Sequence, residues 1–243
     1  MQYWGLTDPG CVREQNQDTF QMEQLDKNTL LCVVCDGMGG AKSGNVASTL
    51  AADVFVEEIR RTWVSGMDLE KIDQMMEAAV KLANFTVYDQ SQQFAEFNGM
   101  GTTLVAALIQ GRQVTVVHVG DSRAYLANRN GITRLTKDHS LVQMMVDRGE
   151  LTPERARTYP GKNYITRAIG TETVVLCDVS HLDMERGDCL LLCSDGLSNL
   201  LDDQEILFEM VHGVNKQYCC QHLLDIAKNR GAPDNVTSVL VVI

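Results

Sequence analysis

The chain has 243 residues, of which 44% are hydrophobic and 22% charged, a composition typical of a globular protein with one substantial core. Its formal charge of −11 argues against nucleic acid as the main partner, because duplex binding depends on Lys and Arg side chains that neutralise phosphates. No apolar run approaches the roughly 20 residues of a membrane helix, and residues 1–5 lack the basic start of a signal peptide. We therefore expect a monomeric cytoplasmic protein without a membrane partner, folded as a single domain over residues 1–243.

The first third of the chain predicts three short strands, at residues 3–6, 19–23 and 30–35. Two amphipathic helices follow, at residues 43–64 and 68–97, because their apolar residues recur with a period close to 3.6. Asp68 is the expected N-cap of the second helix.

The middle of the chain predicts a cluster of strands, and its end returns to helices. Strands are expected at residues 102–109, 114–119, 122–127, 132–135, 174–181, 189–193 and 236–243. Helices are expected at residues 203–211 and 216–229, and residues 139–167 read as short helices and loops. This order differs from strand–helix alternation, and it predicts an α+β fold of two antiparallel sheets packed together with helices outside them.

The eight cysteines are expected to be reduced thiols, as is usual in the cytoplasm. Cys32 and Cys35 form a C-x-x-C motif within an apolar strand, where residues three apart point to opposite faces. No second C-x-x-C and no nearby His pair complete a zinc site, so core positions are the favoured interpretation.

Five aspartates stand where apolar strands begin or end, namely Asp18, Asp36, Asp121, Asp195 and Asp234. A single aspartate in such a place is ordinary turn chemistry. Five of them gathered in one site would repel one another unless a hard cation compensates their charge. Oxygen ligands without His or Cys favour Mg²⁺ or Mn²⁺ over zinc, so the pattern predicts a divalent-cation site.

Eight short motifs resemble, in order and over nearly the whole chain, those of the bacterial PP2C (PPM) protein phosphatases. They lie at residues 12–18 (VREQNQD), 36–40 (DGMGG), 99–103 (GMGTT), 118–125 (HVGDSRAY), 135–140 (LTKDHS), 165–170 (ITRAIG), 194–198 (SDGLS) and 233–237 (PDNVT). The resemblance implies a four-layer αββα sandwich with the metal site in a cleft at one edge of the sheets. It also implies that residues 140–167 form a flap beside that cleft.

The resemblance assigns a role to each candidate site residue. Asp36 is expected to bridge two cations, the carbonyl of Gly37 to bind one of them, and Asp195 and Asp234 to complete the other shell. Asp18 is expected to act mainly through a water ligand, and Asp121, with Asp195, to contribute to a third site. Arg13 is expected to hold the substrate phosphate, since its planar guanidinium donates two parallel hydrogen bonds.

The implied activity is hydrolysis of phosphoserine and phosphothreonine on proteins. A water activated by two Mn²⁺ or Mg²⁺ ions attacks phosphorus without a covalent intermediate. The expected partners are phosphorylated proteins, including a cognate bacterial Ser/Thr kinase. Relatives that act on anti-anti-sigma factors leave a second biological setting open.

Four positions depart from the family's patterns. Ala41 and Asn45 stand where bacterial relatives often have His and Glu, and Met38 and Asn199 stand where eukaryotic relatives have His and Asp. None of the missing residues is an expected ligand of the two-cation core, so we still expect activity. The proton donor to the leaving group has no clear side chain in this sequence.

Two other functions are compatible with parts of the sequence. Residues 36–43 (DGMGGAKS) resemble a nucleotide-binding P-loop, but Asp36 and Ala41 occupy positions where that loop needs glycine. A catalytically dead scaffold that binds phosphoproteins would keep the same fold. Hydrolysis of p-nitrophenyl phosphate with Mn²⁺ distinguishes an enzyme from that scaffold.

Overall fold

The computed structural model describes residues 1–39, 43–213 and 215–243. Three residues of the 36–43 stretch lie outside the described residues, namely Gly40, Ala41 and Lys42. The structure therefore does not test the end of the 36–40 motif, the departure from the family pattern at Ala41 or the P-loop-like alternative.

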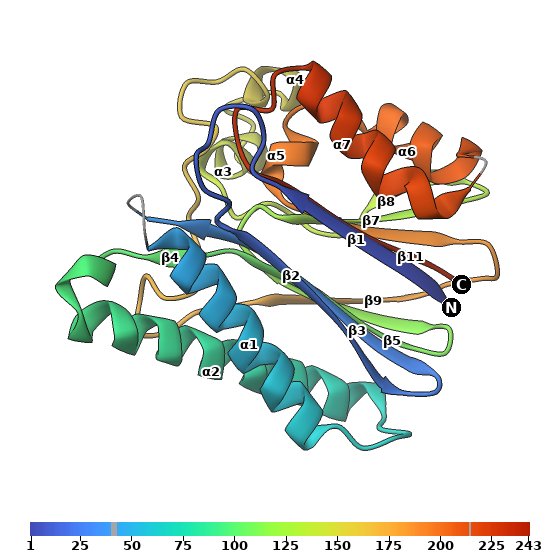
Figure 1. The fold of residues 1–243 in the computed structure, drawn as a ribbon, viewed down its shortest axis with the longest axis horizontal. Helices are drawn as coiled ribbons and strands as arrows, with labels where there is room; N and C mark the ends of the chain where they lie inside the picture. The colour runs from blue at the N-terminus through green and yellow to red at the C-terminus, as the bar shows by residue number, and fades with distance from the viewer. Residues whose placement is uncertain (40–42, 214) are drawn as a thin grey trace.

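Two antiparallel sheets form the centre of the described fold (Figure 1). The first sheet has the order β1 (Gln2–Asp8), β11 (Val236–Val242), β10 (Cys189–Cys193), β7 (Arg123–Asn128) and β8 (Gly131–Arg134). The second has the order β2 (Asp18–Asp26), β3 (Thr29–Met38), β5 (Leu104–Gln110), β6 (Gln113–Val119) and β9 (Asp178–Asp183), and β4 (Gly101–Thr102) pairs with the end of β3. The two termini lie together because β1 pairs with β11.

Helices cover the outer face of each sheet (Figure 1). The second sheet is covered by α1 (Gly44–Thr62) and α2 (Leu69–Gln93), with a 3-10 turn at Ala95–Phe97. The first sheet is covered by α5 (Asp195–Ser198), α6 (Asp203–His212) and α7 (Cys219–Asn229), with a 3-10 turn at Lys216–Tyr218. The short helices α3 (Leu141–Asp147) and α4 (Pro153–Ala156) lie in the connection from β8 to β9. The four-layer αββα sandwich is therefore confirmed.

The side chains of β3 alternate between two cores, as the period of a strand requires. Val33 and Cys35 pack against the helices on one side, and Cys32 and Val34 pack between the two sheets on the other. The two thiols of the C-x-x-C motif therefore diverge as predicted, and all eight cysteines are free. Within the described ranges, no helix has both the length and the apolar character needed to cross a membrane.

Three details test the predicted elements. Asp68 is the N-cap of α2, as predicted, since its side chain accepts a hydrogen bond from the backbone N–H of Lys71 at 3.0 Å. The strand expected at 102–109 is interrupted at Thr103, whose N–H donates to the Asp36 carbonyl. The strand expected at 174–181 was placed too early, because β9 finds its pairing partner only from Asp178, opposite His118 near the end of β6.

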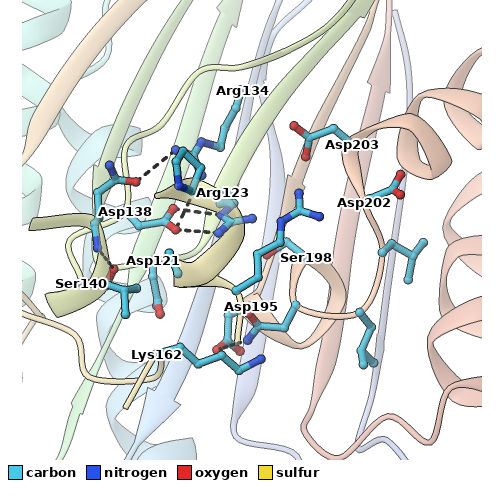
Figure 2. A pocket seen from close by; sticks show the side chains of 18 of the residues that line it. Asp121, Arg123, Arg134, Asp138, Ser140, Lys162, Asp195, Ser198, Asp202 and Asp203 are labelled. Carbon is cyan, nitrogen blue, oxygen red and sulfur yellow. Dashed lines mark hydrogen bonds and ion pairs between the residues drawn. The ribbon is translucent and has the colours of Figure 1, made fainter. Parts of the chain in front are cut away.

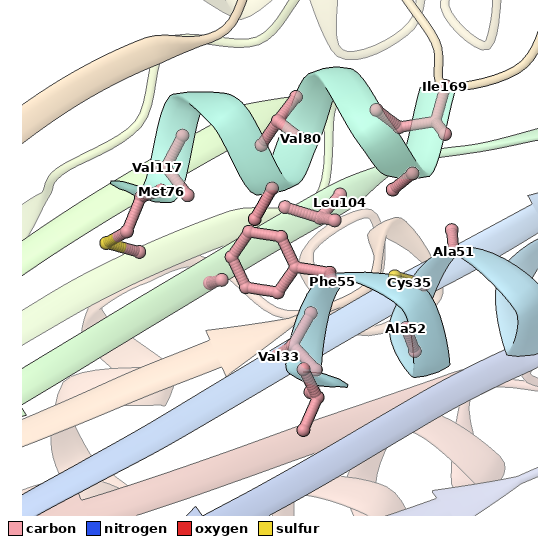
Figure 3. Close-up of a cluster of buried hydrophobic side chains, with 14 of the residues drawn as sticks. Val33, Cys35, Ala51, Ala52, Phe55, Met76, Val80, Leu104, Val117 and Ile169 are labelled. Atoms are coloured by element: carbon pink, nitrogen blue, oxygen red, sulfur yellow. The ribbon is translucent and has the colours of Figure 1, made fainter. Parts of the chain in front are cut away.

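Replacement of Phe55 by alanine tests the core between the helices and the second sheet. Phe55 is fully buried among Met76, Val80 and Leu104 (Figure 3). We expect Phe55→Ala to lower the free energy of unfolding by about 3–5 kcal/mol, because it removes buried apolar contacts and leaves a cavity. Urea denaturation measures the change.

The same substitution at an exposed phenylalanine is the matched control. Phe85 in α2 is 62% exposed, so Phe85→Ala should change the free energy of unfolding by no more than about 0.5 kcal/mol. Equal losses in the two variants would contradict the packing described for Phe55.

Candidate active site

The five aspartates meet at one end of the two sheets. Asp18 and Asp36 face each other directly in the register of β2 and β3. Asp195 follows β10 and Asp234 precedes β11, and these two strands run antiparallel, so the end of one lies beside the start of the other. Asp121 lies two residues beyond the end of β6. The antiparallel register therefore gathers carboxylates that are far apart in the sequence.

A pocket of about 280 Å³ opens at this end of the sandwich. The candidate site residues that line it are Arg13, Asp36, Gly37, Asp121, Asp195 and Asp234. Asp18 is not part of the lining and is only 7% exposed. The structure therefore brings six of the seven predicted residues to one pocket and places the seventh in the adjoining interior.

Asp18 links the two sheets. Its Oδ2 accepts hydrogen bonds from the hydroxyls of Ser194 and Thr237, both at 2.7 Å. Ser194 follows β10 and Thr237 lies in β11, so both belong to the first sheet, whereas Asp18 begins β2 in the second. Its Oδ1 is buried and has no hydrogen-bond partner among the described residues. Burial raises the pKa of Asp18 from 3.8 to about 7, against the lowering effect of the two hydroxyls, and Asp195 and Asp234 raise it further.

The other carboxylates also sit in an environment that disfavours their charge. Burial and then the neighbouring Asp18 raise the pKa of Asp36 well above its ordinary value. Burial and the charge of Asp195 raise the pKa of Asp121 to about 8. Burial and then Asp234 raise the pKa of Asp195, although a hydrogen bond with Asp36 opposes that rise. Desolvation and mutual repulsion thus act together, and a bound cation would relieve both.

Glycines beside two of these aspartates allow close backbone packing. A Cβ on Gly37 would lie 2.1 Å from the carbonyl oxygen of Gly44, and a Cβ on Gly196 would lie 1.9 Å from that of Asn235. Any larger residue at either position would force these backbone segments apart. The Asp-Gly pairs in the sequence therefore have a packing reason.

Arg13 lies at the rim of the pocket and is paired with a candidate ligand. Its Nη2 donates to Asp234 Oδ2 at 2.9 Å, and the two side chains are 54% and 39% exposed. The guanidinium therefore stands beside the carboxylate cluster with part of its surface open to solvent.

A larger cavity of about 720 Å³ adjoins this pocket and shares Asp121 and Asp195 with it (Figure 2). Its walls come from the predicted flap, including Ser140 and Lys162, and from the start of α6, including Asp203. The predicted flap residues therefore border the space next to the carboxylates.

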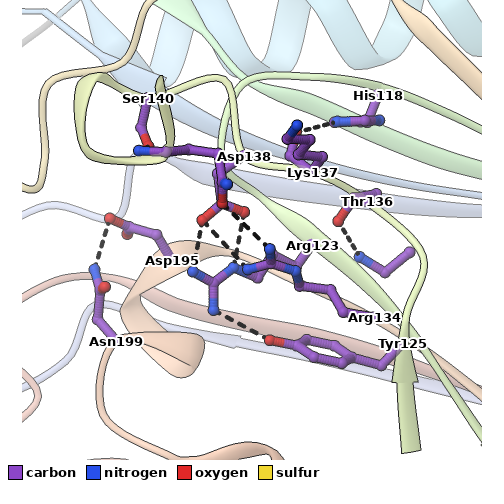
Figure 4. A network of polar contacts seen from close by, with 12 residues as sticks. His118, Arg123, Tyr125, Arg134, Thr136, Lys137, Asp138, Ser140, Asp195 and Asn199 are labelled. Atoms are coloured by element: carbon purple, nitrogen blue, oxygen red, sulfur yellow. Dashed lines mark hydrogen bonds and ion pairs between the residues drawn. The ribbon is translucent and has the colours of Figure 1, made fainter. Parts of the chain in front are cut away.

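Sequence reasoning missed several polar residues that support the cluster. Arg123 forms a bidentate ion pair with Asp138, at 2.9 and 2.6 Å, and a further hydrogen bond to the Tyr125 hydroxyl (Figure 4). Asn199 donates to Asp195 Oδ2 at 2.9 Å, from the position where eukaryotic relatives have Asp. Arg123, Asp138 and Ser194 all lie inside the quoted motifs, which was the available signal, whereas nothing in the sequence shows which residue each of them contacts.

Comparison with known proteins places this arrangement in a family. The family model described as Protein phosphatase 2C matches residues 12–225. The serine/threonine phosphatase stp of Listeria monocytogenes serotype 4b (strain F2365) is 34% identical over 235 residues, which cover 97% of this chain and 93% of that protein.

Solved structures agree with that match. The serine/threonine phosphatase Stp1 from Staphylococcus aureus aligns with a TM-score of 0.94 at 36% identity, over 99% of this chain and 94% of that one. The catalytic domain of the serine threonine protein phosphatase PstP, solved in complex with two manganese ions, aligns with a TM-score of 0.84 at 34% identity, over 98% and 96% of the two chains. The chain therefore belongs to the protein phosphatase 2C family, the class of phosphatase that the sequence motifs predicted.

Proposed function

We propose that this chain hydrolyses phosphoserine and phosphothreonine on proteins with the help of divalent cations, Mn²⁺ or Mg²⁺. The observation that carries the proposal is the convergence of Asp36, Asp121, Asp195 and Asp234 on one pocket, with Arg13 at its rim. Bound cations supply charge neutralisation of the phosphate and activation of water, so that no covalent intermediate is needed.

The residues present fit such cations. The donor set is composed of carboxylate and backbone oxygens, which hard divalent cations prefer. The buried Oδ1 of Asp18 lacks a hydrogen-bond partner in the described part of the chain, and neighbouring, partly buried carboxylates repel one another. A hard cation compensates both features.

We assign the ligands as follows. Asp36 would serve both core cations, Gly37 would offer its carbonyl to one of them, and Asp195 and Asp234 would complete the shell of the other. Asp18 would not bind a cation directly but would contact a water ligand of the cation, which is consistent with its burial. Asp121 belongs, with Asp195, to a third and weaker site.

Arg13 is assigned to the substrate phosphate. Its guanidinium has five N–H donors, of which the ion pair with Asp234 uses one, so it can hold Asp234 and a phosphate oxygen together. Its exposure leaves it accessible to a phosphorylated side chain. We assign no side chain to protonation of the leaving oxygen, because Met38 stands in place of the His that is proposed as general acid in eukaryotic relatives. Asn199 stands in place of their Asp and donates a hydrogen bond to Asp195.

The proposed substrates are phosphorylated proteins, including a cognate Ser/Thr kinase. The names of the relatives, as serine/threonine phosphatases, support this class of substrate. We further propose one cytoplasmic, monomeric domain over residues 1–243, with residues 140–167 as a flap that borders the substrate. A pathway that acts on anti-anti-sigma factors is the second setting, and turnover of a kinase activation-loop phosphopeptide against that of a phosphorylated anti-anti-sigma factor distinguishes the two.

Removal of single carboxylates tests the proposed metal roles. Asp36→Asn and Asp195→Asn should reduce hydrolysis of p-nitrophenyl phosphate in Mn²⁺ to background while the protein stays folded, because each change weakens cation binding and relieves repulsion. Asp225→Asn, on the exposed surface of α7, is the control and should keep full activity. Near-normal turnover in either site variant would refute the assignment, and folded wild-type protein without hydrolysis would favour the scaffold.

Replacement of Arg13 tests the phosphate site. We expect Arg13→Ala to raise KM for a phosphopeptide by about 10–100-fold, since hydrogen bonds to charged groups contribute about 1.5–3 kcal/mol. The Mn²⁺ concentration for half-maximal activity should change much less. Arg129→Ala, in the exposed turn after β7, should leave KM unchanged. A larger effect on Mn²⁺ dependence than on KM would move Arg13 out of the phosphate site.

The pH dependence of stability tests the compensation of the carboxylates. Asp18 and Asp121 have folded-state pKa values of about 7 and about 8, above the ordinary 3.8, so the folded protein without cations binds more protons than the unfolded chain between these limits. Their stabilising contribution is complete at low pH and is lost as pH rises through 7 and 8. The Tm in EDTA should therefore fall from pH 5.5 to 8.5.

Saturating Mn²⁺ should abolish most of that fall, because cations then neutralise the carboxylates. Thermal unfolding by calorimetry in EDTA and in Mn²⁺ measures both curves, and Asp121→Asn should flatten the EDTA curve. An EDTA curve that is flat over this pH window, or identical to the Mn²⁺ curve, would be inconsistent with the buried cluster.

A further inference from the structure

The loop that carries Asp121 is tightly packed and has a left-handed backbone conformation at Gly120, which favours glycine. Gly120 has a φ of +104°, and a Cβ on it would lie 2.6 Å from the Cγ2 atom of Thr103. On the other side of Asp121, the Ser122 hydroxyl lies 2.7 Å from the Thr103 hydroxyl, which also accepts the backbone N–H of Asp36 at 3.0 Å. Thr103 therefore ties the residue after Asp121 to Asp36.

His139 holds the residue before Asp121. The backbone N–H of His139 donates to the Gly120 carbonyl at 2.9 Å, and the Gly120 N–H donates to His139 Nδ1 at 3.1 Å. These two reciprocal bonds satisfy both backbone groups of a buried glycine. Asp121 is thus fixed on both sides, by His139 through Gly120 and by Thr103 through Ser122.

The Gly120 bond fixes the tautomer of His139. Since Nδ1 accepts the hydrogen bond from the Gly120 N–H, the neutral ring carries its hydrogen on Nε2. The Nε2 atom lies 3.3 Å from Asp178 Oδ2, which can accept its hydrogen, and Asp178 Oδ1 accepts from Arg167 Nη1 at 2.8 Å. Arg167 Nη1 also lies 3.2 Å from Nε2, so with Nε2 protonated both nitrogens are donors that face the Asp178 carboxylate. A carboxylate that orients an imidazole in this way is a common arrangement behind functional groups.

The ring of His139 is buried and stacked on His118, with 4.6 Å between the ring centroids. His118 is itself in contact with the Lys137 carbonyl through Nε2 at 2.9 Å (Figure 4). Burial, and then the neighbouring His118, lower the pKa of His139, and burial lowers the pKa of His118. The neutral form that the Gly120 bond requires is therefore the stable one near neutral pH.

His118, His139 and Asp178 could by distance hold a metal ion. The hydrogen bonds argue otherwise, because Nδ1 of His139 is taken by Gly120 and the Arg167 guanidinium lies 3.2 Å from Nε2. A cation there would compete with a positive charge already in place. The cluster is thus a positioning network.

His139 also stands at the base of the predicted flap. Its carbonyl accepts the Thr166 N–H at 2.7 Å, and the next residues are joined across the segment by the Ser140–Ile165 bridge and by the Leu141 N–H to the Tyr164 carbonyl at 2.8 Å. One residue therefore contacts both ends of the 140–167 segment and the loop before Asp121.

We propose that His139 is a positioning residue that joins the base of the 140–167 segment to the Asp121 loop and so keeps Asp121 in the carboxylate cluster. The role of Asp121 as a ligand rests on the proposed function, whereas the clamp on Gly120 does not. Displacement of the flap base would be transmitted to Asp121 through His139.

Two substitutions distinguish the role of Nδ1 from that of Nε2 in the His139 ring. In His139→Asn the amide oxygen can replace Nδ1 as acceptor for Gly120, whereas in His139→Gln the amide reaches toward Asp178 and leaves Gly120 without its acceptor. Both variants lose the stacking of His139 on His118, so a difference between the two variants reports the loss of the hydrogen bond from the Gly120 N–H. The readouts are hydrogen exchange of the Gly120 amide by NMR and calorimetric titration with Mn²⁺ without substrate.

We expect exchange of the Gly120 amide in His139→Gln to be about tenfold faster than in the wild type, and the weakest Mn²⁺ binding step to be weakened about 10–100-fold. His139→Asn should stay close to the wild type in both. His181→Gln is the matched control, because its Nδ1 and Nε2 contact Thr115 and Asp73 in a similar manner away from Gly120, and it should change neither readout.

Equal Gly120 exchange in the Asn and Gln variants would overturn the clamp. Unequal exchange with equal Mn²⁺ binding would overturn the link to Asp121. Imidazole ¹⁵N NMR of the wild type adds a test that needs no variant, because it should show His139 protonated on Nε2 and unprotonated on Nδ1, and the opposite tautomer would refute the proposal. Wild-type protein without Mn²⁺ binding would instead refute the proposed function, and Gly120 exchange would still decide the clamp.

Discussion

The repulsion among buried and partly buried carboxylates at one end of the two sheets is the constraint on which the rest of the structure depends. Asp18 and Asp36 come from one sheet, and Asp195 and Asp234 lie next to the ends of β10 and β11 in the other, so the cluster forms only when the sheets are packed together. The hydroxyls of Ser194 and Thr237 hold Asp18 across that interface. Folding without cations must therefore accept an electrostatic cost that the hydrophobic layers offset.

The packed layers of the sandwich hold the carboxylates in place and offset their repulsion. Alternating apolar residues on β3 pack on both faces of the second sheet, and helices close the outer faces. Polar residues around the cluster support it in different ways, since Asn199 donates to the Asp195 carboxylate and Thr103 accepts the backbone N–H of Asp36. A preformed set of oxygens reduces the ordering that cation binding would otherwise require, which suits the proposed catalytic role.

Much of the fold and of the candidate site could be predicted from the sequence, because the relevant signals are local. Apolar periodicity identified α1 and α2, and the aspartates at strand ends indicated the carboxylate cluster that lines the pocket. The start of β9 was missed because it depends on where β6 offers a partner, which is a long-range property. The partners of Asp18 and the role of His139 were also hidden, since they are contacts between residues distant in the sequence.

The central claim is that the cluster binds divalent cations through Asp36, Asp195 and Asp234. Anomalous diffraction from crystals grown in Mn²⁺, collected above and below the manganese absorption edge, tests it most directly. The account predicts two strong manganese peaks among these three carboxylates, with Asp36 contacting both. A map without a manganese peak in this cluster, from crystals of active protein, would contradict it.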